Sequence, residues 1–172
     1  MAVNDFVVLK RAGRSFSIVS IVSWMAFLTV NLIFLAVPPL SETQGFPKSF
    51  SLMEAAQKGN KKEVEKLLAQ GANVDFQDEY GDSALLSASR RGFVEIVKIL
   101  LDAGAQVNLT DSDGGTPLIE SSKMGHADVV KLLLSRGADV SAKDKDNETA
   151  ISYATQNDLK EITEILIKHG AQ

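Results

Sequence analysis

The stretch Gly71-Ala72-Asn73-Val74-Asp75 returns 33 residues later as Gly-Ala-Gln-Val-Asn at residues 104–108, and again as Gly-Ala-Asp-Val-Ser at residues 137–141. A second series of glycines, which starts at Gly59, keeps the same period, and apolar residues hold constant positions between the two series. A repeat of this length is typical of solenoid proteins, in which each unit buries its apolar face against its neighbours. The sequence therefore predicts an internally repeated domain.

The third copy carries a family resemblance. Residues 113–118 read Asp-Gly-Gly-Thr-Pro-Leu, residues 125–134 read Gly-His-Ala-Asp-Val-Val-Lys-Leu-Leu-Leu, and residues 137–140 read Gly-Ala-Asp-Val. Together they closely resemble the ankyrin repeat. The resemblance covers about residues 49–172 and implies an all-α solenoid whose units each form a turn, a short helix, a tight turn, a longer helix and a loop. It identifies a fold and not an activity.

Four ankyrin repeats are expected, at residues 49–78, 79–111, 112–144 and 145–172. Proline is favoured at the first position of a helix, so Thr116-Pro117 predicts a helix start. The recurring glycines predict helix ends, where a left-handed residue is needed. The first helices are expected to stack through one continuous core ladder, formed by Leu52, Leu85, Leu118 and Ile151.

The charge is unevenly distributed along the chain. The formal net charge is −4, and the acidic excess belongs to the repeats, while the first 14 residues are basic. An acidic repeat domain without a basic stripe argues against a nucleic-acid partner, because phosphates require clusters of Lys and Arg. The chain has no cysteine, which excludes disulfides, thiol nucleophiles and cysteine-based metal sites.

Residues 15–40 are predicted to form one transmembrane helix that acts as a signal anchor. The stretch lacks charged residues, and its apolar core, residues 16–37, forms a helix of roughly 33 Å, which is long enough to cross the hydrocarbon layer. Trp24 and Asn31 are the expected membrane-contact residues. A cleaved signal peptide is the alternative, but its apolar core is usually shorter, and no clean small-x-small cleavage site follows.

The flanking charges predict the orientation of this helix. Lys10, Arg11 and Arg14 precede it within the basic segment 1–14, whereas only Lys48 follows closely, in the predicted linker 41–48. The positive-inside rule therefore keeps the N-terminus cytoplasmic and places the repeats outside. A bacterial inner-membrane protein with periplasmic repeats is the favoured localisation.

No catalytic constellation is recognised in the sequence, so no enzyme activity, cofactor, metal or small-molecule substrate is expected. The chain has two histidines. His126 follows a repeat glycine, a frequent ankyrin pairing, and is expected to be structural. His169 falls in the last helical turn, where a cation suits the helix dipole. The aspartates at the loop tips are expected to stabilise turns through hydrogen bonds to their own backbone.

A binding surface for a protein partner remains as the expected functional site. In ankyrin proteins, the loop tips and first helices form a concave face for partners. Carried over position by position, this face presents Phe76, Glu79, Tyr80, Asp82, Arg90, Arg91, Asp113, Lys123, Met124, Lys145 and Asp146. Phe76, Tyr80, Arg90 and Arg91 are expected near its centre, because aromatic and arginine side chains dominate binding hot spots. In the alternative interpretation, the two aromatics pack on a neighbouring hairpin.

The leading hypothesis is a membrane-anchored ankyrin module that binds or scaffolds a partner protein close to the bilayer surface. Two alternatives stay open. The protein is a small accessory subunit of a larger membrane complex, with the transmembrane helix as part of the interface, or it is a soluble exported ankyrin protein after signal-peptide cleavage.

Overall fold

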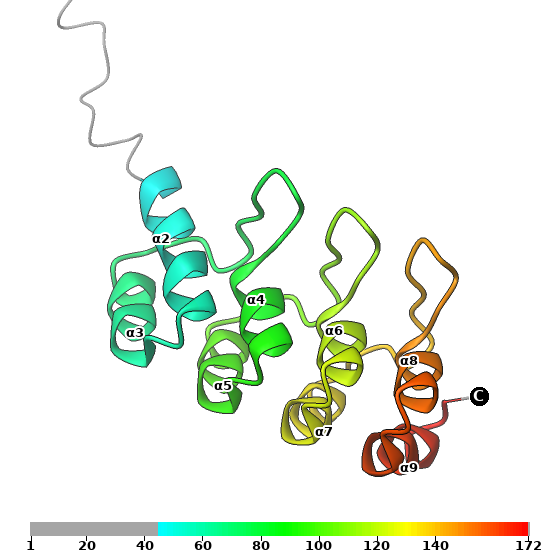
Figure 1. Ribbon diagram of the computed structural model, residues 1–172. Coiled ribbons are helices and arrows are strands. Elements are labelled where there is room, and N and C mark those ends of the chain that lie inside the picture. Colours follow the sequence, from blue (N-terminus) through cyan, green and yellow to red (C-terminus); the bar gives the residue numbers. More distant parts are fainter. Residues whose placement is uncertain (1–44, 172) are drawn as a thin grey trace, which may run out of the picture. The chain divides into compact units, whose positions relative to one another are not determined.

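A computed structural model describes residues 45–171, in which the chain folds into four pairs of antiparallel helices (Figure 1). The pairs are α2 (Gly45–Gln57) with α3 (Lys61–Ala69), α4 (Ala84–Arg91) with α5 (Val94–Asp102), α6 (Pro117–Lys123) with α7 (Ala127–Ser135), and α8 (Ala150–Gln156) with α9 (Lys160–Lys168). The basic segment 1–14, the predicted transmembrane helix 15–40, and with it Trp24 and Asn31, lie outside the described residues. Within residues 45–171 no helix has the length and apolar character needed to cross a membrane.

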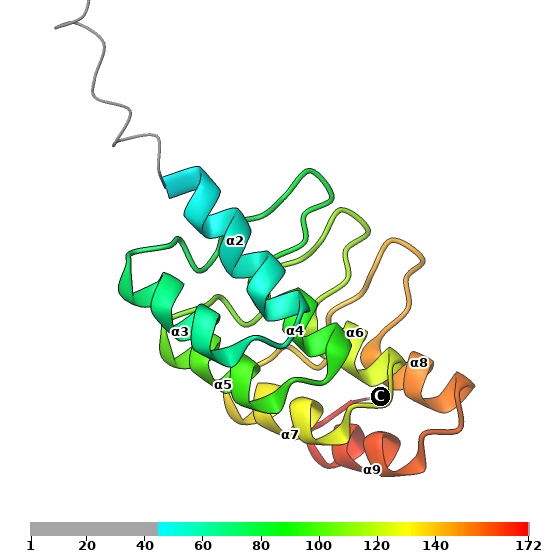
Figure 2. The same ribbon diagram turned by 60° about the vertical axis from the view of Figure 1, so that its left-hand side comes forward.

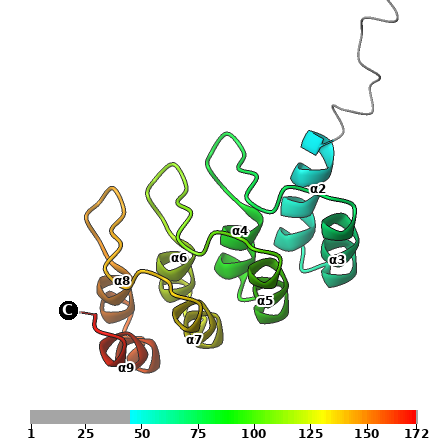
Figure 3. The same cartoon turned by 180° about the vertical axis from the view of Figure 1, so that it is seen from behind.

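The helices of the repeat domain form two rows. The first helices of the pairs, α2, α4, α6 and α8, pack side by side in one row, and the second helices form the other row. Figure 2 shows both rows, with the connecting loops projecting together beyond the first row. Seen from behind, α5 packs between α3 and α7 (Figure 3). The prediction of an all-helical ankyrin solenoid is confirmed for the described residues.

Short side chains fix where the first helices begin. The hydroxyl groups of Ser83, Thr116 and Thr149 accept hydrogen bonds from backbone N–H groups three residues ahead, at 3.2, 3.2 and 3.3 Å. Such caps satisfy N–H groups that have no partner inside the helix.

Within residues 45–171, two residues with a left-handed backbone conformation are not glycine: Asn147 has φ 63° and Asp158 has φ 53°. Both residue types tolerate this conformation better than other side chains.

The core runs continuously through the stacked helices. Leu52, Leu85 and Leu118 are fully buried, as expected from the ladder. Ile151 is only half-buried, because its helix belongs to the last repeat of the described residues and none of these residues forms a further repeat over it. The ladder is therefore complete at the centre and partly open at the C-terminal end.

The predicted linker 41–48 differs from the structure, because helix α2 already begins at Gly45. This helix has 13 residues, whereas α4 has eight and α6 has seven. The other first helices begin at capping residues that follow a hairpin, whereas α2 begins at the first described residue and has seven residues before the position equivalent to Leu85, which is Leu52. Pro47 lies in the first turn, where its missing N–H costs no helical hydrogen bond.

Candidate functional site

Three hairpins project from the solenoid, and each is built around one aspartate. Hairpin 1 comprises residues 77–83, hairpin 2 residues 110–116 and hairpin 3 residues 143–149. In hairpin 1, Oδ1 of Asp78 accepts hydrogen bonds from the N–H groups of Tyr80 and Asp82, both at 2.9 Å. Asp111 and Asp144 repeat this arrangement in the other two hairpins. These aspartates stabilise turns, as their positions predict.

Neighbouring hairpins are joined by one repeated main-chain hydrogen bond. The N–H of Ser112 donates to the carbonyl of Tyr80 at 2.8 Å, and the N–H of Lys145 donates to the carbonyl of Asp113 at 2.9 Å. Glu79 is the equivalent donor in hairpin 1. Within residues 45–171 no hairpin lies before it, and its N–H has no hydrogen-bond partner there. Hairpin 1 therefore presents an unpaired edge.

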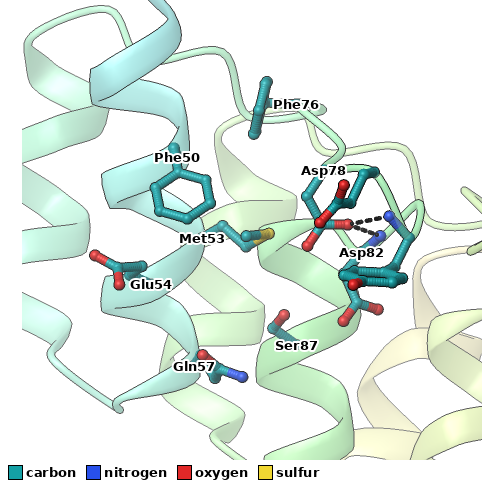
Figure 4. A pocket seen from close by; sticks show the side chains of 10 residues that line it. Phe50, Met53, Glu54, Gln57, Phe76, Asp78, Asp82 and Ser87 are labelled. Carbon is teal, nitrogen blue, oxygen red and sulfur yellow. Dashed lines mark hydrogen bonds between the residues drawn. The ribbon is translucent and has the colours of Figure 1, made fainter.

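Beside this edge lies a groove of about 480 Å³ between α2 and hairpin 1, which we call the first groove. Phe50 and Met53 come from α2, and Phe76 comes from the loop that leads to hairpin 1. Figure 4 shows these three side chains around one opening. The remaining lining is polar apart from one tyrosine and consists of Glu54, Gln57, Asp78, Glu79, Tyr80, Asp82 and Ser87.

Two aromatic side chains of the first groove are strongly exposed. Phe50 is 42% exposed and Tyr80 is 65% exposed, whereas Phe76 is half-buried. The equivalents of Phe50 in the later repeats are the polar cap residues Ser83, Thr116 and Thr149, and those of Tyr80 are Asp113 and Asp146. At these two repeat positions, aromatic side chains thus occur only at Phe50 and Tyr80 among the described residues, and the repeat pattern does not require them.

The first groove is also acidic. Four carboxylates line it, and its lining holds no lysine, arginine or histidine. The carboxylate of Asp82 is paired with Arg90, and that of Glu54 lies 3.4 Å from the amino group of Lys58. Asp78 and Glu79 make no ion pair within residues 45–171. The groove therefore carries uncompensated negative charge beside exposed aromatic rings.

Arg90, a predicted contact residue, is half-buried and is held in place by three carboxylates. Its guanidinium pairs with both oxygens of Asp82 at 3.1 Å, with Asp111 at 3.3 Å and with Glu120 at 2.7 Å. Burial alone lowers the pKa of Arg90, but the hydrogen bonds and negative charges of Asp82 and Glu120 raise its pKa above the ordinary value. Arg90 and Asp82 thus tie α4 to hairpins 1 and 2 and to α6. Arg90, which was predicted as a contact residue, therefore also holds parts of the fold together.

The other predicted contact residues lie in two places. Phe76, Glu79, Tyr80 and Asp82 come together in the first groove. The rest are exposed on α4, α6 and hairpins 2 and 3, outside the first groove; they are Arg91, Asp113, Lys123, Met124, Lys145 and Asp146.

Phe50 and Met53 are groove residues that the sequence interpretation missed. A signal was available for Phe50, because a large apolar residue stands where the other repeats have a polar helix cap. Met53 carried no comparable signal, since apolar residues also occupy its position in the next two repeats.

Tyr153 is a further residue that the sequence did not single out. Its hydroxyl donates to Oδ2 of Asp144 at 2.7 Å, and the amino group of Lys123 lies 4.9 Å from its ring centre. The hydrogen bond to Asp144 raises the pKa of Tyr153 to about 12, and burial adds to the effect. For Asp144, burial alone raises the pKa, but hydrogen bonds from Tyr153 and from two backbone N–H groups lower it below the ordinary value.

His126 has a packing role, as predicted. Its Nε2 lies 3.2 Å from the carbonyl oxygen of Arg90, and its ring covers Gly92 so closely that a Cβ there would lie 2.6 Å from Nδ1. Within residues 45–171 no three His, Cys, Asp or Glu side chains form a group suited to a metal ion.

Comparison with known proteins agrees with this architecture. The family model for ankyrin repeats (3 copies) matches residues 52–144, which is more than half of the chain. No curated protein matches the sequence. The 33-residue period, the paired helices and the family match lead to one conclusion: the chain belongs to the ankyrin repeat family.

Proposed function

We propose that this protein is a membrane-anchored ankyrin module that binds a partner protein close to the membrane surface, and that it is not an enzyme. Ankyrin repeats indicate a protein–protein interaction module. The observation that carries the proposal is the first groove, where Phe50 and Tyr80 expose aromatic surface that the solenoid does not use. Exposed aromatics at a cleft are typical of interface anchors.

The membrane part of the proposal is supported by the sequence of the first 41 residues. An uncharged stretch, residues 15–41, follows a head that holds Lys10, Arg11 and Arg14. This pattern favours a single span with the repeats on the non-cytoplasmic side. Because α2 begins at Gly45, few residues separate the proposed span from the first repeat, so the repeat domain is expected to stay close to the bilayer.

Partner capture from membranes tests the proposal. The tagged full-length chain is produced in the organism that naturally contains it and is purified in mild detergent. The proteins that co-purify with the wild type and with Tyr80→Ala are then compared. We expect membrane-derived partners to be lost from the Tyr80→Ala sample while its melting temperature stays unchanged, because exposed substitutions seldom disturb a fold. An identical set of partners would contradict a role for the groove.

A second candidate is an accessory subunit whose transmembrane helix forms the interface. Small residues recur every three positions in the proposed span, at Ser17, Ser20, Ser23 and Ala26, and such residues let helices approach closely. Replacing residues 16–37 with an unrelated spanning helix separates the two candidates. Loss of the partners on this exchange, with no effect of Tyr80→Ala, favours the subunit.

A further inference from the structure

The unpaired edge of hairpin 1 offers a main-chain donor to a partner. In hairpins 2 and 3, the N–H groups of Ser112 and Lys145 bond to the preceding hairpin. Glu79 occupies the same position in hairpin 1, and its N–H has no partner within the described residues. A carbonyl group of an extended peptide can take the place that the preceding hairpin takes elsewhere, as in other cases where a peptide continues an existing hydrogen-bond pattern.

The side chains around this edge favour positive charge. Asp78 and Glu79 carry negative charge that no ion pair within residues 45–171 compensates, and the exposed rings of Phe50 and Tyr80 lie on the same groove. Aromatic faces attract cations, with effective contact at about 6 Å or less from the ring centre. A lysine or arginine side chain can therefore meet a ring and a carboxylate together.

The same combination occurs beside hairpin 3, between α6, α8 and Asp144 of the hairpin. There the amino group of Lys123 lies 4.9 Å from the ring centre of Tyr153, and the hydroxyl of that tyrosine is bonded to Asp144. A cation over a ring beside a carboxylate is thus an arrangement that this fold already accommodates. In the first groove the ring and the carboxylates are present, and the lining supplies no cation.

We propose that the first groove binds an extended basic segment of a partner protein. The carbonyl of one residue of that segment accepts the N–H of Glu79, and a neighbouring lysine or arginine side chain lies between the Tyr80 ring and the carboxylates of Asp78 and Glu79. The inference deepens the proposed function of partner binding and rests on it. It names a basic peptide as the ligand class of this groove.

Fluorescence anisotropy on the full-length chain in detergent micelles tests the inference. The probe is a labelled peptide in which lysine alternates with serine, and its comparison is the same peptide with glutamate in place of lysine. We expect the lysine peptide to bind at least roughly tenfold more tightly than the glutamate peptide. Added salt is expected to weaken this binding because the charges are exposed. Equal binding of both peptides, or no binding of either, overturns the inference.

Two charge reversals locate the binding site. Glu79→Lys in the first groove should weaken binding of the lysine peptide by roughly tenfold. Glu164→Lys, on the exposed side of α9, changes the net charge equally and should leave the affinity unchanged. If both variants weaken binding to the same extent, the attraction is a general charge effect and the inference is wrong.

Aromatic substitutions provide a readout that does not depend on charge. Tyr80→Ala should weaken binding of the lysine peptide, and Tyr80→Phe should preserve it because the ring remains. Melting curves of each variant check that the fold is intact. Unchanged binding to Tyr80→Ala contradicts the placement of the cation over this ring.

The chain's own basic head is the competing occupant. Deletion of residues 1–14 should leave the affinity for the lysine peptide unchanged. If that peptide binds only after the deletion, Lys10, Arg11 and Arg14 occupy the groove, and the assignment to a partner is overturned. If no peptide binds while Tyr80 still governs partner capture from membranes, the basic specificity fails and the proposed function stands.

Discussion

At the scale of single residues, Arg90 shows how a side chain that resembles a binding residue serves the fold. One guanidinium bonds to Asp82, Asp111 and Glu120, which belong to hairpin 1, hairpin 2 and α6. Its own side chain is 30% exposed, and those of Asp111 and Glu120 are 10% and 12% exposed. Partly buried carboxylates that lose their cation are left uncompensated, which costs more than the loss of a surface ion pair.

Arg90→Met is therefore expected to lower the free energy of unfolding by about 2 kcal/mol, because three carboxylates lose their common partner. The neighbouring Arg91→Met is the matched control, since Arg91 is exposed and forms no ion pair with residues 45–171. Chemical denaturation of both variants measures the difference. Equal stabilities of the two variants would show that the Arg90 network contributes nothing.

Tyr153 provides a second prediction at this scale, and it concerns pH. The folded-state pKa of about 12 lies above the ordinary value of 10.0. The protonated phenol is thus favoured in the folded protein, so its stabilising contribution is complete below pH 10.0 and is lost as the pH rises towards about 12. Phenolate absorbance, followed in a Tyr80→Phe background, reports Tyr153 alone, because the chain has two tyrosines.

Asp144→Asn tests the cause of this shift. Without the negative charge that accepts the hydroxyl proton, the pKa of Tyr153 should fall towards its ordinary value of 10.0. An unchanged titration curve would exclude the hydrogen bond to Asp144 as the cause.

At the scale of elements, two adjacent serines of α6 differ in their hydrogen bonding although both are fully buried. The hydroxyl of Ser121 donates to the carbonyl of Leu118 at 3.1 Å, whereas the hydroxyl of Ser122 has no hydrogen-bond partner among residues 45–171. The same holds for Ser89, its equivalent in α4, and the first repeat has alanine at this position, Ala56. A buried hydroxyl without a hydrogen bond destabilises the fold.

Ser122→Ala is accordingly expected to raise the free energy of unfolding by about 1 kcal/mol, because it removes an unsatisfied group at little cost in volume. Ser121→Ala is the control and should not stabilise, since it loses a hydrogen bond. Thermal melting of each variant measures the change in stability relative to the wild type. Destabilisation by Ser122→Ala would mean that its hydroxyl has a role that the described contacts do not include.

The elements also show which parts of the structure the sequence could predict. The period, the helix caps and the glycines depend on local conformation, so the sequence alone predicted the helix pairs and hairpins. The early start of α2 was missed because no cap residue marks it. The role of Arg90 was missed because its partners are 8, 21 and 30 residues away. Phe76, Glu79 and Tyr80 were predicted as contact residues, but the groove that joins them to Phe50 depends on how α2 packs against hairpin 1.

At the scale of the repeat domain, stability depends on contacts between neighbouring repeats, so the central repeats are expected to be the most sensitive to truncation. Leu118→Ala should cost about 2–5 kcal/mol, because its side chain is fully buried. Ile151→Ala in the last repeat should cost clearly less, because that side chain is half-buried. Equal losses in chemical denaturation would contradict the assignment of the core ladder.

The arrangement of the hairpins along the repeat domain explains why binding is assigned to the first repeat. Each later hairpin is bonded to the hairpin before it, whereas hairpin 1 faces α2 across an open groove. The groove also belongs to the repeat that directly follows the proposed anchor in the sequence. The end of the solenoid that follows the proposed anchor is therefore the end at which a membrane-associated partner is expected.

Site-specific photo-crosslinking in intact membranes tests this central claim most directly. The photoreactive residue p-benzoylphenylalanine is placed at position 80 in the first groove, or at position 146 on hairpin 3 as the control, in the full-length chain. We predict a discrete cross-linked product from position 80 that is absent from position 146 and is lost when Glu79→Lys is added. Products of equal yield from both positions, or from position 146 alone, would contradict partner binding at the first groove.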